Sequence, residues 1–272
     1  FMNSFNPTYK YIIHPTKGIQ VLIDEDVSNF NSHLLNIGDL KAPSQSIEVL
    51  SVVFDLEGFT NFIKQVDPQL TIPYFISDFF KWLFQSIIES LIDHDQNNTL
   101  WAEFPFFSKF LGDGILFLWK IDLHKIFSLN KFIDSDRLHE HLHRFLCNII
   151  ASLYNFCNRY PDFLKKSKSK FINPPPRLRC GIARGSVYPI GYGKDYIGPC
   201  INISSRLQNF HNLSFVFSAR GIDPNGFNIA FEQIFIQKLI SIRGIGEGEL
   251  IYIVKDEFDN LPKEEKAYFR DI

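Results

Sequence analysis

The sequence predicts an α+β fold in which helices pack on one antiparallel-rich sheet. Three observations support this prediction. The apolar run from Ile47 to Asp55 is typical of a central strand. The turn Gly112-Asp113-Gly114, set between two apolar runs, is typical of a β-hairpin. Elsewhere, apolar residues recur at spacings of three and four, which indicates amphipathic helices that alternate with the strands.

The first half of the chain is predicted to contain a short helix, a longer helix and a β-hairpin. Residues 58–64 are predicted to form a short helix, and Pro68 and Pro73 mark the entry to a longer one. One apolar stripe predicts the buried face of that longer helix: Phe75, Phe79, Trp82, Leu83, Ile87 and Leu91. The hairpin then joins an arm ending at Leu111 to the arm 115–119.

In the second half, a second amphipathic helix is predicted over residues 136–159. The basic, proline-rich stretch from Lys165 to Pro176 is predicted to be a loop with a solvated surface. The remaining predicted elements are a second hairpin (179–183 with 187–190), a helix from about Gly198 to Phe210, and strands near Phe215, Ile236 and Ile251.

Length and composition limit the classes of function. With 272 residues, of which 45% are hydrophobic and 21% charged, the chain can bury a full core and is globular. Its formal net charge of −2 and pI near 6.5 exclude a polyanion-binding surface along the whole chain. We therefore expect no nucleic-acid partner.

The cysteines and the absence of long apolar runs point to the cytoplasm. Cys147, Cys157, Cys180 and Cys200 form no CxxC pair, so we expect reduced thiols in the core. No signal peptide is evident, and no apolar run reaches the roughly 18 residues that a membrane span needs. We therefore expect a cytoplasmic protein without a membrane partner.

Two aspartates each lie at the end of an apolar run and close to glycine. Asp55 closes the first strand, and Asp113 lies in the hairpin turn. A carboxylate at the edge of a hydrophobic strand is costly to desolvate unless a positive charge lies against it. Two such carboxylates, brought together by strand pairing, indicate a hard divalent cation and a phosphate. We therefore predict a metal-holding pair in an enzyme that acts on a nucleoside triphosphate.

Four segments together resemble the class III nucleotidyl cyclase catalytic domain. They are 54–60 (FDLEGFT), 109–114 (KFLGDG), 181–187 (GIARGSV) and 195–207 (DYIGPCINISSRL). The closing segment 242–247 is similar to the last hairpin of that family. Segments 179–185 and 196–202 look most like stand-alone bacterial cyclases of the Pycsar antiphage type.

The resemblance implies a ferredoxin-like βααβ catalytic domain over residues 47–255. Residues 1–46 would be an N-terminal extension and residues 256–272 a C-terminal tail. The resemblance also implies a homodimer with composite active sites. Each site would convert a nucleoside triphosphate to its 3′,5′-cyclic monophosphate and pyrophosphate, with two divalent cations, Mg²⁺ or Mn²⁺.

The family pattern also implies roles for single residues of this chain. The metal ligands would be Asp55, Asp113 and the backbone carbonyl of Leu56. The backbone amides of Gly58, Phe59 and Thr60 would hold the triphosphate. From the partner subunit, Asn202 would orient the ribose and Arg206 would stabilise the charge on the reacting phosphorus.

The same pattern assigns recognition of the base to Lys109 and Asp195. Lysine offers only hydrogen-bond donors and an ionised aspartate only acceptors, so this pair complements adenine or cytosine. The Pycsar-type members make cyclic UMP or cyclic CMP. That resemblance favours UTP or CTP over ATP, and it implies antiphage signalling in which a separate effector responds without binding the enzyme directly.

The sequence departs from the family pattern at two triphosphate positions. Many members have arginine where Ser186 stands and lysine where Ile245 stands. Arg184 and Arg243 lie nearby and are the expected substitutes for these two contacts, with changed geometry. Of the two, Arg184 is expected among the substrate-binding residues.

Two alternatives come from other functional classes. His139, Glu140 and His143 match the HExxH pattern of zinc peptidases, but no third ligand is evident, so a solvated histidine face explains them better. The other alternative is a non-catalytic module with the cyclase fold that binds a nucleotide or a protein. Degenerate members of that kind usually lack an aspartate or the Asn/Arg pair, whereas this sequence keeps both.

Overall fold

The computed structural model contains an eight-stranded sheet. Seven of its strands lie in the order β4-β5-β3-β6-β8-β10-β9, and β7 pairs with β6. The structure describes residues 8–14, 18–24, 45–64, 67–92, 102–121, 135–167, 171–222 and 229–272. These residues divide between two compact units, a larger one of residues 48–186 and 199–272 and a smaller one of residues 1–47 and 187–198.

The sheet of the larger unit is mostly antiparallel, as the sequence predicts. Its strands are β3 (Ile47–Leu56), β4 (Phe107–Phe110), β5 (Gly114–Lys120), β6 (Leu178–Ile190), β8 (Phe215–Ser218), β9 (Phe235–Ile242) and β10 (Gly246–Val254). The pairs β3–β5, β4–β5, β8–β10 and β9–β10 are antiparallel, whereas β6 and β8 are parallel. The α+β prediction is therefore confirmed.

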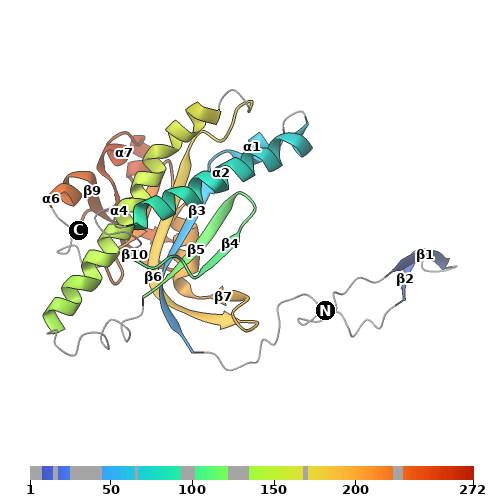
Figure 1. Ribbon diagram of the computed structural model, residues 1–272, viewed down its shortest axis with the longest axis horizontal. Helices are drawn as coiled ribbons and strands as arrows, with labels where there is room; N and C mark the ends of the chain where they lie inside the picture. Colours follow the sequence, from blue (N-terminus) through green and yellow to red (C-terminus); the bar gives the residue numbers. More distant parts are fainter. Residues whose placement is uncertain are drawn as a thin grey trace. The chain divides into compact units, whose positions relative to one another are not determined.

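Two long helices cover one face of this sheet. They are α2 (Pro68–Leu91) and α4 (Ser135–Ser167), and Figure 1 shows both lying across the strands. The predicted stripe of α2 is buried, apart from Trp82, which packs partly buried against the core. The shorter helices are α1 (Phe59–Phe62), α5 (Pro199–Leu207), α6 (Ile229–Ile234), α7 (Lys255–Asp259) and α8 (Lys263–Lys266).

Aromatic side chains fill the layer between the two long helices. The ring of Phe75 on α2 lies 6.2 Å from that of Phe163 on α4, and Phe79 lies 6.1 Å from Tyr160. The Tyr160 hydroxyl donates a hydrogen bond to the carbonyl of Pro175 at 2.9 Å. This bond ties α4 to the proline-rich segment that precedes β6. Much of the phenylalanine content of the sequence therefore belongs to one packed core.

The two faces of the sheet differ, and the alternation along β3 assigns residues to each. Val52 and Phe54 belong to the core beneath α2 and α4. Because successive side chains of a strand point to opposite faces, Ser51 and Asp55 point to the other face. The helix α5 packs on that other face, since the buried hydroxyls of Ser51 and Ser204 hydrogen-bond at 2.8 Å.

Two predicted boundaries in this region were wrong. The helix α4 continues to Ser167, so Lys165 and Lys166 belong to its last turn rather than to a loop. Lysines are favourable there because the C-terminal end of a helix carries partial negative charge. The prediction of a hairpin over 179–190 was also wrong, because β6 is one continuous strand from Leu178 to Ile190. Arg184 and Ser186 both hydrogen-bond to Glu48, which holds the Arg-Gly-Ser stretch extended.

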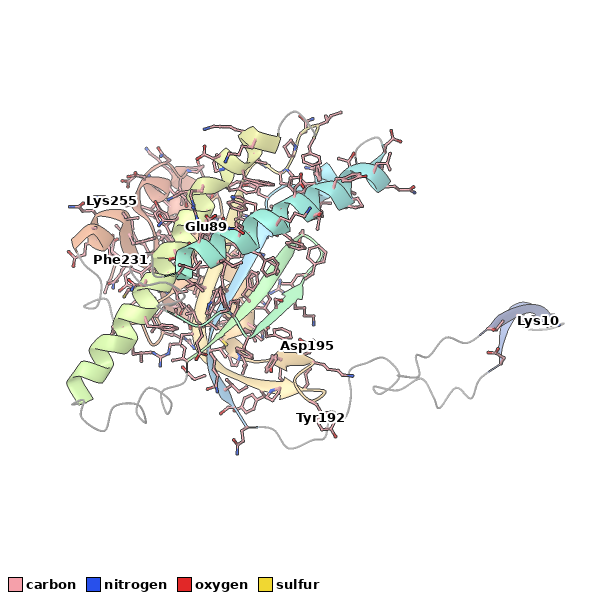
Figure 2. The ribbon with its side chains drawn as sticks, viewed as in Figure 1. Lys10, Glu89, Tyr192, Asp195, Phe231 and Lys255 are labelled. Carbon is pink, nitrogen blue, oxygen red and sulfur yellow. The ribbon has the colours of Figure 1, made fainter. Side chains whose placement is uncertain are left out.

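The smaller unit contains two described hairpins. The strands β1 (Tyr9–His14) and β2 (Gly18–Ile23) form an antiparallel pair that the sequence did not predict, because this segment has no clear apolar period. The end of β6 pairs with β7 (Asp195–Ile197), and Figure 2 labels Tyr192 and Asp195 on this hairpin. We call residues 187–198 the β6–β7 hairpin.

After β10 the chain folds back along the sheet edge. Leu239 of β9 and Arg270 exchange two backbone hydrogen bonds of 2.9 Å, so the last residues extend the edge at β9.

The described cysteines are free, and Cys157, Cys180 and Cys200 are buried. Burial raises the pKa of the Cys200 thiol to about 11, which disfavours its thiolate. Of the helices described, none is long and apolar enough to cross a membrane.

Candidate active site

The strand pairing of β3 and β5 brings Asp55 and Asp113 to the same end of the sheet. Asp55 lies opposite Gly114 in the register, and the Leu56 amide donates a 3.0 Å hydrogen bond to the Asp113 carbonyl. A Cβ atom at Gly114 would lie 2.1 Å from the Phe54 carbonyl oxygen. Only glycine therefore permits this close pairing, which explains the glycine beside Asp113.

The two carboxylates have different environments. Asp55 is only 5% exposed, whereas Asp113 is exposed to solvent. Burial raises the pKa of the Asp55 carboxyl above its ordinary value, and the negative charges of Asp113 and Glu57 add to the rise. Hydrogen bonds and positive charge from Arg179 act in the opposite direction. The structure therefore contains a buried carboxylate that repels an exposed carboxylate close by.

Arg179 is a residue of this site that the sequence analysis missed. Its Nε and Nη2 both donate to Asp55 Oδ2, at 3.0 and 2.5 Å. The signal in the sequence was a cation, Arg179, placed at the start of an apolar strand. Such a cation needs an anion to compensate for its burial.

A second ion pair supports the loop that follows Asp55. Glu57 accepts a 2.5 Å hydrogen bond from Arg177 Nε, and the Glu57 amide donates to the Arg177 carbonyl at 3.0 Å. The other side of the Arg177 guanidinium donates to the Asn212 carbonyl at 2.9 Å. This pair fixes the backbone just before the segment 58–60, where the family pattern implies a triphosphate contact.

Lys109 lies on the same face of the sheet as Asp55. It faces Leu116 across the β4–β5 pair, and Leu116 faces Val53 across the β3–β5 pair. Directly paired residues point to the same side, so Lys109, Val53 and Asp55 share one face. The Lys109 side chain is exposed.

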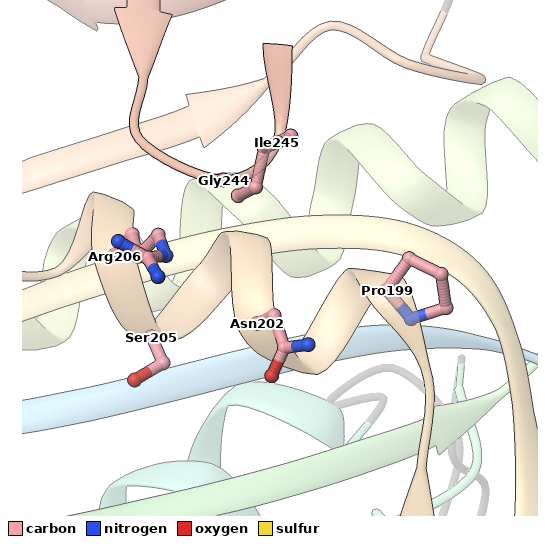
Figure 3. Close-up of a pocket in the computed structure, with 6 residues that line it drawn as sticks. All are labelled: Pro199, Asn202, Ser205, Arg206, Gly244 and Ile245. Carbon is pink, nitrogen blue, oxygen red and sulfur yellow. The ribbon is translucent and has the colours of Figure 1, made fainter.

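A separate pocket of about 360 Å³ lies between α5 and the turn that joins β9 to β10. Figure 3 shows the lining residues: Pro199, Asn202, Ser205 and Arg206 from α5, and Gly244 and Ile245 from the turn. Asn202 and Arg206 are four residues apart and face this pocket together, as their spacing predicts. Pro199, Ser205 and Gly244 also line the pocket, and the sequence analysis gave none of them a role.

Arg206 differs from four other arginines around the sheet, which are held by ion pairs. Arg177, Arg179, Arg184 and Arg220 each form an ion pair with a glutamate or aspartate. Among the residues that the structure describes, Arg206 has neither a salt bridge nor a hydrogen bond from its guanidinium, and its side chain is exposed. An unpaired guanidinium that lines a pocket is suited to bind an anionic group.

Tight packing fixes α5 on the sheet. A Cβ atom at Gly181 would lie 2.1 Å from the Ser204 carbonyl oxygen and 2.3 Å from the Gln208 nitrogen. The glycine of β6 therefore allows α5 to approach the backbone of the sheet directly. Ser51, which bonds α5, precedes Asp55 by four residues, or about 13 Å along the strand. Because β8 runs parallel to β6 and β10 antiparallel to β8, the β9–β10 turn lies at the end of the sheet opposite to the start of β6, where Arg179 meets Asp55. The pocket and the two carboxylates are thus separate features.

Two further residues of the predicted site have partners of their own. Arg184 donates to Glu48 Oε1 at 3.0 Å and to the Gly221 carbonyl at 2.6 Å. Asp195 accepts a 2.9 Å hydrogen bond from the Tyr196 amide within the β6–β7 hairpin. The structure therefore does not bring Arg184 to Asp55 or to the pocket lined by Arg206.

The oxygen donors fit a hard divalent cation. Within the described ranges, no cluster of three histidine, cysteine, aspartate or glutamate side chains exists that would hold a metal by itself. Asp55, Asp113 and the Leu56 carbonyl supply only oxygen atoms, and Mg²⁺ typically takes one or two carboxylates together with phosphates and water. The side chains of His139 and Glu140 lie outside the described residues, so the zinc alternative stays a prediction.

Comparison with known proteins shows a likeness of fold. No protein-family model matches the sequence, and no curated protein matches it by sequence. The adenylyl cyclase CyaB from P. aeruginosa superposes with a TM-score of 0.50 and 13% identity, covering 78% of this chain and 96% of that one. A bacterial light-regulated adenylyl cyclase gives a TM-score of 0.51 and 13% identity. The match covers 80% of this chain but 54% of that protein, so the chain spans about half its length. At these identities the likeness shows the fold, and the predicted cyclase fold is confirmed.

Proposed function

We propose that this protein is a metal-dependent nucleotidyl cyclase that acts in the cytoplasm. It would convert a nucleoside triphosphate to its 3′,5′-cyclic monophosphate and pyrophosphate. The observation that carries this proposal is the pair of carboxylates at the end of β3, one buried and one exposed, on a cyclase fold. The energetic cost of burying Asp55 near a second negative charge is typical of a functional site.

The residues of this chain fit the roles that cyclisation needs. Asp55, Asp113 and the Leu56 carbonyl would hold two divalent cations, Mg²⁺ or Mn²⁺, which supply positive charge at the reacting phosphate and acidify the ribose 3′-hydroxyl. Arg206 would stabilise negative charge on that phosphate, and Asn202 would orient the ribose. The amides of residues 58–60 would hold the triphosphate.

The proposed enzyme is a homodimer, because the two halves of its site are separate within one chain. The carboxylates lie at the end of β3, whereas Asn202 and Arg206 line a different pocket. A second copy would bring its pocket to the carboxylates of the first. The β6–β7 hairpin supports such a contact, since Tyr192 is 77% and Ile197 55% exposed. Exposed apolar side chains gathered on one element favour an interface.

A pyrimidine substrate is the first choice within this proposal. Lys109 and Asp195 provide donors and acceptors that suit cytosine or adenine, and the resemblance to Pycsar-type enzymes favours UTP or CTP. An antiphage signalling role goes with that resemblance. ATP is the second candidate, and the names of two of the matching structures support it, since both are adenylyl cyclases.

Incubating the purified protein with each nucleoside triphosphate tests the proposal. ATP, GTP, CTP and UTP are supplied separately with Mn²⁺, and the products are identified by mass spectrometry. We expect a cyclic monophosphate and pyrophosphate in equal amounts from a pyrimidine triphosphate. Cyclic AMP alone would replace the pyrimidine assignment with the adenylate one. Binding of a nucleotide without any product would favour the non-catalytic module.

A further inference from the structure

Arg179 contacts Asp55 in an unequal way. Both of its donors, Nε and Nη2, converge on Oδ2, at 3.0 and 2.5 Å. A guanidinium that neutralises a carboxylate frequently bonds both oxygens as a fork. Here the second oxygen, Oδ1, receives no hydrogen bond from Arg179. One oxygen of Asp55 is therefore held, and the other is left for a different positive group.

The Arg179–Asp55 ion pair is shielded from solvent, and hydrogen bonds hold the backbone on either side of Arg179. The side chain of Arg179 is 14% exposed and that of Asp55 is 7% exposed. The neighbours of Arg179 along the chain are fixed, since the Cys180 amide bonds the Ser214 carbonyl and the Arg177 carbonyl accepts the Glu57 amide. A shielded ion pair between fixed backbones restricts the carboxylate more strongly than a surface pair does.

We propose that Arg179 is a positioning residue that holds Oδ2 of Asp55 and thereby presents Oδ1 to a divalent cation. This inference rests on the proposed function, which makes Asp55 a metal ligand. Hydrogen-bond partners behind a ligating carboxylate fix its orientation, and their loss typically lowers metal affinity by about 10- to 100-fold. The opposite effect, repulsion between guanidinium and cation, would make removal of Arg179 tighten binding. The Mn²⁺ affinity of an Arg179 variant distinguishes the positioning effect from the repulsion.

The test measures Mn²⁺ affinity without nucleotide, by the loss of the electron paramagnetic resonance signal of free Mn²⁺. In Arg179→Met, which keeps an unbranched apolar stem but removes the guanidinium donors, we expect affinity to fall by about 10- to 100-fold. Arg220→Met is the matched control, because Arg220 also pairs with a buried carboxylate, that of Glu249, through Nε at 2.8 Å. Wild-type affinity is expected in the control. Arg179→Lys keeps the charge but loses the planar fork, so a smaller loss is expected.

The outcomes separate this inference from the proposed function. Unchanged or tighter Mn²⁺ binding in Arg179→Met overturns the positioning role, and so does wild-type affinity in Arg179→Lys if the methionine variant does not fold. Asp55→Asn tests the metal assignment itself. If Asp55→Asn binds Mn²⁺ like the wild type, or the wild type binds none, the metal site is wrong whatever Arg179 does. If only Asp55→Asn loses the metal, the inference about Arg179 fails and the metal site stands.

Discussion

Asp113→Asn is expected to abolish cyclic-nucleotide formation while the protein stays folded. The side chain is exposed, so its replacement by an isosteric amide costs little stability, within about 0.5 kcal/mol. A cation held by the two carboxylates would contribute several kcal/mol to the transition state, so a loss of about 4 kcal/mol lowers the rate about 1,000-fold. The measurements are kcat at saturating Mn²⁺ and the thermal unfolding midpoint.

Asp162→Asn is the control for this change. Asp162 is also an exposed aspartate, and its only described ion pair is with Lys165 on the same helix. We expect wild-type kcat in this control.

Removal of metal by a chelator should stop turnover in the unmodified protein, and added Mg²⁺ or Mn²⁺ should restore it. Near-normal turnover by Asp113→Asn would remove the metal assignment.

Arg206→Ala is expected to lower kcat by about 1,000-fold or more and to change KM only a few-fold, as for other arginines that act on a transferred phosphoryl group. The reason is that charge on the phosphate develops in the transition state, so the contact is strongest there. In the described part of the chain, the Arg206 guanidinium has no partner that would give it a structural role. Its loss should therefore leave the unfolding midpoint nearly unchanged.

Arg159→Ala serves as the control for the loss of a guanidinium. Arg159 is an exposed arginine of α4, and its guanidinium lies 5.6 Å from the centre of the Phe156 ring. We expect both kcat and KM to remain those of the wild type in this variant. A rise in KM with unchanged kcat in Arg206→Ala would instead assign Arg206 to ground-state binding of the substrate.

The parts of the fold that the sequence predicted are those with local signals. β3 is mostly apolar, and the turn of the β4–β5 hairpin contains the Asp113-Gly114 pair, in which no residue larger than glycine fits at position 114. The face of α5 that carries Asn202 and Arg206 follows from their spacing alone. These signals depend on neighbours within a few residues, so they can be read without knowledge of the fold.

The features that the sequence did not predict depend on distant contacts. Arg179 and Asp55 are 124 residues apart, and only the pairing of β6 beside β3 brings them together. The Arg-Gly-Ser stretch of β6 resembles a turn, but Glu48, 136 residues before Arg184, binds it in an extended form. The pocket around Arg206 likewise needs the β9–β10 turn, which is distant from α5 in the sequence and lies beside it only in the folded chain.

In the proposed dimer, each active site takes its carboxylates from one subunit and its arginine from the other. Mixing Asp113→Asn and Arg206→Ala subunits under conditions that allow exchange tests this arrangement, since each variant alone is expected to be inactive. At equal amounts, half of the dimers formed at random are mixed and each has one intact site, so about a quarter of the wild-type rate should return. If the mixture stays as inactive as the separate variants although mixed dimers form, the composite site does not exist.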